Sequence, residues 1–122
     1  MKAYGEKVWL IPDGYISGVS HNIPSHDAVC VLNTSDKDAK INLTLYFEDR
    51  DKMDCFIVKC KAGKTHHIRM DRITGENGKK VPVNTPYAIL VESNIEVVVQ
   101  YSRLDTTQSE MALMTTIAYA VK

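Results

Sequence analysis

The chain has 122 residues, 44% apolar and 25% charged, the composition of a soluble globular protein with one core, and we expect a single domain over residues 1–122. Fifteen basic residues balance fifteen acidic ones, so no global charge draws the protein to nucleic acid or to an anionic membrane. The three cysteines show no CxxC spacing, and there is no signal-peptide pattern or long apolar run, so we expect a cytoplasmic protein with reduced thiols.

The first half of the chain is dominated by strand patterns. KVWLI (7–11) is a short apolar run, and Pro12-Asp13-Gly14 after it is a strong turn signal. Residues 15–24 have the composition of a loop. DAVCVLN (27–33) is β-branched and mostly apolar, typical of a strand buried on both faces. Residues 39–49 alternate strictly, which predicts one face in the core and one in water. The core face holds Ile41, Leu43, Leu45 and Phe47.

The second half continues this pattern, with an irregular connection at residues 71–86. A hairpin around residues 76–78 is one way to form that connection, and the residues alone leave it open. Asn94 is expected to make a turn between two separate strands. The strands of this half are expected at residues 53–60, 65–70, 87–93 and 96–104.

The tail, SEMALMTTIAYAVK (109–122), fits two structures. Leu113, Met114, Ile117 and Val121 fit a helical stripe, and Leu113, Thr115, Ile117 and Tyr119 fit a strand face equally well. The β-branched and aromatic residues favour the strand. Counting it, about eight short strands with turns between them predict an all-β fold, an antiparallel β-sandwich of the jelly-roll kind.

The stretch VVVQYSRLDTTQ (97–108) begins as a buried strand and then fills with polar groups. Alternation places Arg103 and Asp105 on one face, where they can form an ion pair, with Gln100 on the other face. Three explanations stay open: the strand leaves the core, its polar groups pair across a subunit interface, or they line a ligand groove. An interfacial ion pair would fix register more than it would stabilise.

The chain carries no GxSxG, HExxH or phosphate-binding glycine loop, which weakens the case for an enzyme without excluding an unrecognised hydrolase. His66 and His67 are adjacent, but neighbouring side chains on a strand point to opposite faces. A zinc site needs three convergent ligands, which His26 and Asp27 would have to complete from a distant strand. We therefore expect half-buried, hydrogen-bonded histidines, no metal and no cofactor. The thiols, expected to be small buried hydrophobes rather than catalytic groups, are Cys30, Cys55 and Cys60.

Trp9 stands beside a polar turn, where an aromatic ring can stack on a sugar or a base, although a single Trp is more often in a core or an interface. A nucleic-acid surface needs a basic stripe with interleaved aromatics. The Lys and Arg residues here are scattered apart from Lys79-Lys80, so nucleic acid is not an expected partner.

Several segments, in order over nearly the whole chain, together resemble the soluble sensory rhodopsin transducer family. They are WLIPDGYI (9–16), SHDAVCVLN (25–33), LTLYFED (43–49), KTHHIR (64–69), ESNIEVVVQYSRLDTTQ (92–108) and LMTTIAYA (113–120). The resemblance implies a small cytoplasmic β-sandwich that assembles as a homotetramer, with the tail as a strand. It also implies binding and signalling rather than catalysis.

The partners that this resemblance implies are other copies of the chain and the cytoplasmic face of a membrane photoreceptor. A small sugar-like ligand is a second possibility, because the family's sandwich is similar to carbohydrate-binding modules. The positions that match the family's motifs carry no catalytic role. The candidate ligand or interface residues are Trp9, His26, His67, Arg69, Gln100, Arg103, Asp105 and Gln108.

Overall fold

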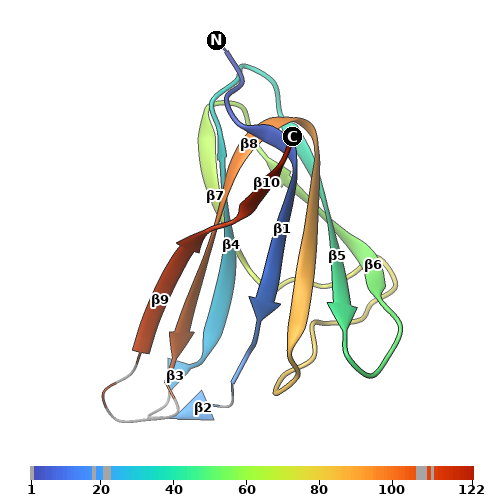
Figure 1. Cartoon of the computed structure of the whole chain (residues 1–122), viewed down its shortest axis with the longest axis vertical. Coiled ribbons are helices and arrows are strands. Elements are labelled where there is room, and N and C mark those ends of the chain that lie inside the picture. The colour runs from blue at the N-terminus through green and yellow to red at the C-terminus, as the bar shows by residue number, and fades with distance from the viewer. Residues whose placement is uncertain (1, 18, 21–22, 107–109, 111) are drawn as a thin grey trace.

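The computed structural model describes residues 2–17, 19–20, 23–106, 110 and 112–122, and all of the regular structure in them is β-strand (Figure 1). Among these residues there is no helix that could cross a membrane. The strands are β1 (Glu6–Gly14), β2 (Val19–Ser20), β3 (Ile23–Pro24), β4 (His26–Asn33), β5 (Ala39–Phe47), β6 (Met53–Cys60), β7 (Lys64–Arg69), β8 (Tyr87–Asp105), β9 (Ala112–Ile117) and β10 (Tyr119–Val121).

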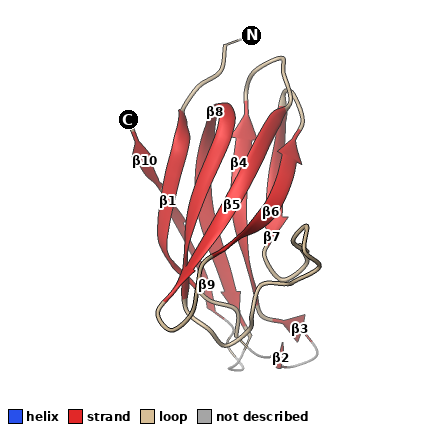
Figure 2. Cartoon of the chain, turned by 90° about the vertical axis from the view of Figure 1, so that its right-hand side faces the viewer, coloured by secondary structure: helices blue, strands red, loops and turns tan. Residues whose placement is uncertain are grey.

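Eight of these strands form one antiparallel sheet that folds over into two layers, because β8 pairs with different neighbours along its length (Figure 2). Residues 87–93 of β8 lie between β1 and β5, which gives the order β10-β1-β8-β5-β6, here called the β1 layer. Residues 98–105 lie between β4 and β9, which gives β9-β8-β4-β7, here called the β4 layer. The all-β sandwich expected from the sequence is confirmed.

The expected turn at Asn94 is wrong, because β8 runs unbroken from Tyr87 to Asp105. The amide side chain of Asn94 instead accepts a hydrogen bond from the backbone N–H of Lys40, at 2.8 Å, beside the start of β5. The pairing with β1 shifts register between Val8 and Glu6 at this level. The local turn signal of an Asn is therefore overridden by pairing on both sides, and the strand changes layer instead of reversing.

The tail is a strand, as the residues favoured, but it is divided into β9 and β10. At the division, the backbone N–H of Ala118 donates to the Val99 carbonyl at 3.1 Å. β9 then belongs to the β4 layer and β10 to the β1 layer, so the tail crosses between layers at one edge. Figure 1 shows this edge on the side of the molecule opposite β6.

Two connections show more structure than their composition indicated. Residues 15–24, expected to be a loop, contain the short pair β2 and β3. The hairpin left open around residues 76–78 is present: the Gly75 N–H donates to the Lys79 carbonyl at 2.7 Å, and Thr74 bridges to Lys80.

The core lies between the layers and follows the period-two alternation of the strands. Ile41, Leu43 and Leu45 of β5 are fully buried, as predicted, and they share one apolar cluster with Val29 and Val31 of β4. The odd-numbered residues of β8 from 87 to 101 point inward with the exception of Ile95, which is half-buried. The same alternation, continued to the end of β8, places the half-buried Arg103 and Asp105 at the edge of the core.

Candidate functional site

A buried carboxylate, Asp27 on β4, joins the two layers. Its Oδ2 accepts a hydrogen bond from the Tyr101 hydroxyl at 2.6 Å and another from the Tyr87 hydroxyl. Tyr87 begins β8 in the β1 layer, whereas Tyr101 lies on the part of β8 that belongs to the β4 layer. Asp27 is fully buried, and its Oδ1 has no hydrogen-bond partner among the described residues.

Burial raises the pKa of the Asp27 carboxyl above its ordinary value, because the charged form loses its hydration. The hydrogen bonds from Tyr101 and Tyr87, and the positive charge of Arg103, oppose this rise. Burial and the neighbouring Asp27 in turn raise the pKa values of both tyrosine hydroxyls. The two phenols therefore remain protonated at neutral pH and act as donors to the carboxyl group.

Arg103 connects this buried cluster to solvent. It stands opposite Asp27 in the register of β8 with β4. Its Nε donates to the Tyr101 hydroxyl at 3.2 Å. Its Nη2 lies 3.4 Å from a carboxylate oxygen of Asp13 on β1. The Arg103 side chain is 20% exposed and that of Asp13 is 72% exposed. Asp105 was the partner expected for Arg103, and the structure shows Asp13 as an ion-pair partner that was not expected.

Gly14 makes room for Tyr87 in this cluster. A Cβ at Gly14 would lie 2.5 Å from a ring carbon of Tyr87, closer than carbon atoms approach. The turn expected at Pro12-Asp13-Gly14 is wrong, because β1 continues through Gly14 with an irregular register after Ile11. The glycine is instead required by the close approach of the strand to a buried ring. Asp13, one residue earlier, is the partner of Arg103.

An open groove of about 570 Å³ lies at the edge where the tail crosses between layers, and we call it the edge groove. Leu10 and Ile11 of β1, with Met114 of β9 and Tyr119 of β10, supply apolar walls. Asp13 and Tyr101 also line it, so the groove reaches the ion pair of Arg103.

Four of the predicted site residues lie on the outer face of the β4 layer. His67 and Gln100 both pair with Cys30 of β4, from β7 and β8 respectively, which aligns them in one row. Arg69 lies in the next row and forms a two-bond ion pair with Asp71, both at 2.8 Å. His26 is at the start of β4 on the same face.

The other predicted residues lie elsewhere. Trp9 is buried in the core, where its Nε1 donates to the carbonyls of Glu6 and Val97 at 3.0 and 3.1 Å, so its ring is not available to stack on a ligand. Arg103 and Asp105 have the inward parity of β8 rather than the outer face. Gln108 lies outside the described residues. The described members of the predicted set are therefore divided among the outer face of the β4 layer, its inward side and the core position of Trp9 on β1.

The described residues hold no group of three His, Cys, Asp or Glu side chains placed to bind a metal ion. His66 is half-buried, and its ring bonds to the Lys59 carbonyl at 2.9 Å, whereas His67 is exposed. Of the thiols, only Cys60 is fully buried, and that burial raises its pKa. Cys30 and Cys55 are half-buried, so the expectation of three buried thiols is wrong for these two.

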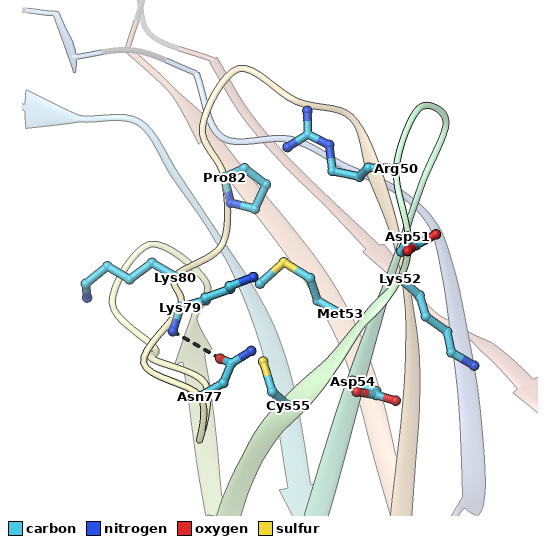
Figure 3. A pocket seen from close by; sticks show the side chains of 10 residues that line it. All are labelled: Arg50, Asp51, Lys52, Met53, Asp54, Cys55, Asn77, Lys79, Lys80 and Pro82. Atoms are coloured by element: carbon cyan, nitrogen blue, oxygen red, sulfur yellow. Dashed lines mark hydrogen bonds between the residues drawn. The ribbon is translucent and has the colours of Figure 1, made fainter.

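A second hollow, of about 540 Å³, lies between the β5–β6 connection and the hairpin at 75–80 (Figure 3). Its lining includes four basic residues, as an anion site would require: Arg50, Lys52, Lys79 and Lys80. In Figure 3 the charged ends of Arg50, Lys52 and Lys80 point in different directions, so they do not converge on one point.

The cluster of Asp27, Tyr87 and Tyr101 was not predicted as a site. One signal was present in the sequence: Asp27 is the only charged residue among the apolar residues of 27–33, at a position whose parity matches Val29 and Val31. An acidic side chain at an inward position requires donors. Which donors it finds cannot be deduced locally, because Tyr87 and Tyr101 lie 60 and 74 residues away.

Comparison with known proteins assigns the chain to a family. Residues 4–120 match the family described as "Anabaena sensory rhodopsin transducer". A crystal structure of Thermotoga maritima 1070 is 39% identical, with a TM-score of 0.85 over 96% of both chains. The Anabaena sensory rhodopsin transducer is 31% identical, with a TM-score of 0.75 over 89% of this chain and 96% of its own. No significant match was found among curated proteins. The chain therefore belongs to the family of the Anabaena sensory rhodopsin transducer.

Proposed function

We propose that this protein is a non-enzymatic cytoplasmic signalling adaptor that acts through protein–protein contacts as a homotetramer. The observation that carries the proposal is an exposed apolar strip on β9 and β10. Leu113, Ile117 and Tyr119 are 75%, 63% and 68% exposed in the single chain. Every residue of β9 is exposed, although the strand is fully paired with β8 along one side.

Such a strip is unfavourable on an isolated protein. Its apolar side chains remain in water, and an edge strand leaves backbone groups free to pair with another chain. Burying a leucine or isoleucine side chain contributes about 1.5–3 kcal/mol, so a few such residues from each copy can drive association. The net charge of zero adds no long-range repulsion between copies. A second copy of the chain is therefore the occupant that we propose for the strip.

Membership of the family supports a rhodopsin-type membrane receptor as a further partner. The Anabaena neighbour is itself called a sensory rhodopsin transducer. We propose that the assembled protein contacts the cytoplasmic face of such a receptor and relays its state. Binding to the rhodopsin of the same cell in lipid nanodiscs, against empty nanodiscs, tests this part. If the genome of the source cell encodes no rhodopsin, the proposed receptor is contradicted, whereas the proposed assembly is not.

The assembly is tested by light scattering after size-exclusion chromatography. Leu113→Asp places a charge on the strip and should shift the mass from four chains toward smaller species. Ile57→Asp is the matched control, because Ile57 is also an exposed apolar residue but lies on β6, at the far edge of the β1 layer. A native protein that is monomeric at submillimolar concentration, or a Leu113→Asp variant that keeps the native mass, would contradict the proposal.

A small-ligand or carbohydrate-binding module is the second candidate. The row of His67 and Gln100, with Arg69 beside it, offers donors and acceptors on an accessible sheet face, as a hydroxyl-rich ligand requires. The burial of Trp9 removes the aromatic platform expected for stacking on a sugar. A panel of sugars that leaves the melting temperature unchanged would count against this candidate.

A further inference from the structure

We propose that the edge groove binds a small apolar carboxylic acid, with its apolar body between β1 and the tail and its carboxylate on Arg103. The groove is distinct from the outer-face row of the β4 layer. Its walls combine the aliphatic side chains of Leu10, Ile11 and Met114 with the ring of Tyr119. Pockets for small molecules typically combine such walls with a few polar groups that fix orientation.

Arg103 does not itself line the groove, but it lies directly behind two residues that do, Asp13 and Tyr101. Arg103 is held in place from behind, because its Nε donates to the Tyr101 hydroxyl and its guanidinium carbon lies 5.7 Å from the centre of the Tyr101 ring. That hydroxyl is fixed in turn by its 2.6 Å hydrogen bond to the fully buried Asp27. A guanidinium positioned in this way presents its remaining N–H groups as a fork that matches a carboxylate.

Asp13 interacts only weakly with the guanidinium group of Arg103. Its carboxylate oxygen and its backbone carbonyl both lie 3.4 Å from Nη2, at the long limit of a hydrogen bond, and the Asp13 side chain is mostly in solvent. An exposed ion pair of this kind contributes little stability. A ligand carboxylate that enters the groove can therefore replace Asp13 on Arg103 at small cost. Asp13 acts in this scheme as an internal competitor for the site.

The site leads to a prediction with a definite sign. Removing Asp13 should strengthen binding, whereas removing the charge of Arg103 should abolish it. If Asp13 merely lined the groove, its removal would change the affinity for an anion only slightly. If Asp13 held a cationic ligand, its removal would weaken binding instead of strengthening it. Ile117 and Tyr119 belong both to the strip and to the groove, so the inference is tied to the assembly proposed above; Leu113 is on the strip alone, and its variants separate a loss of assembly from a loss of binding.

The test is isothermal titration of the full chain with phenylpropanoate and octanoate, using their uncharged amides as controls. The acids should bind at least about tenfold more tightly than the amides, since a hydrogen bond to a charged group is worth that factor or more. Asp13→Ala should raise the affinity for the acids several-fold. The control Asp49→Ala, which removes another exposed ion pair with an arginine, should leave it unchanged.

Two further variants locate the site. Arg103→Met should lose binding, and Thr116→Trp, which fills the groove from β9 without altering Arg103, should lose it as well. Leu113→Ser should bind as the native protein does. The proposal is overturned if the folded native chain binds none of the acids, if acids and amides bind equally, if Asp13→Ala weakens binding, or if Thr116→Trp leaves it intact.

Discussion

Replacing Tyr101 with phenylalanine tests how much the hydrogen bonds of the buried cluster contribute to the stability of the fold. The change keeps the ring in the core and removes one oxygen. That oxygen donates to Asp27 Oδ2 at 2.6 Å and accepts from Arg103 Nε at 3.2 Å and from the Tyr15 backbone N–H at 3.3 Å. A hydrogen bond to a charged group contributes about 1.5–3 kcal/mol. Because Arg103 is partly exposed, water can replace the acceptor that it loses. We therefore expect the free energy of unfolding to fall by about 2–3 kcal/mol in total.

The assay is urea unfolding of the native and variant chains at one protein concentration, because association would otherwise alter the apparent stability. Tyr46→Phe is the matched control. The hydroxyl of Tyr46 lies on the outer face of β5, and the residue is 43% exposed. A change within about 0.5 kcal/mol is expected there. If Tyr101→Phe falls within the same range, the hydrogen bond from Tyr101 to Asp27 contributes nothing measurable to the free energy of unfolding.

Three other predictions concern the same core. The folded-state pKa of Asp27 lies above the ordinary value of 3.8, so the stability that this proton contributes is complete below pH 3.8 and is lost as pH rises through the folded-state pKa. The free energy of unfolding of the native chain should therefore fall relative to that of Asp27→Asn as pH rises, and parallel pH profiles in urea would contradict this. Gly14→Ala should cost about 1–3 kcal/mol in the same assay, because the new methyl group overlaps the Tyr87 ring; an unchanged midpoint would show that the ring can move. Iodoacetamide should modify the two half-buried thiols of the folded protein, whereas Cys60 should react only after unfolding, as peptide mass spectrometry would show.

The sequence was sufficient for the features that depend on local alternation. The inward set of β5 could be predicted because Ile41, Leu43 and Leu45 alternate with polar residues. The strand character of the tail followed from its β-branched residues. Its division at Ala118 did not, because that division arises from pairing with β8 on one side and β1 on the other.

The candidate site was less predictable, because it is made of long-range contacts. Arg103 was a candidate on the basis of its polar stretch alone, and its contact with Asp13, 90 residues away along the chain, could not be deduced locally. Asn94 was assigned to a turn from its residue type, and its pairing with β5 could not be read locally. Trp9 was a candidate because aromatic residues often bind ligands, and the two carbonyls that hold its indole become visible only in the folded chain.

The sharing of β8 between the layers has a consequence for folding. Tyr87 pairs with Gly14 and Val97 pairs with Glu6, so the contacts of this strand join the two ends of the chain. Neither layer is complete until β8 is in place, and β8 lies in the last third of the sequence. Such a high contact order makes folding slow, since the entropy of closing the long loops is lost before the contacts form. A fragment that ends before β8 has no central strand in either layer, and we therefore expect the two layers to fold and unfold as one cooperative unit.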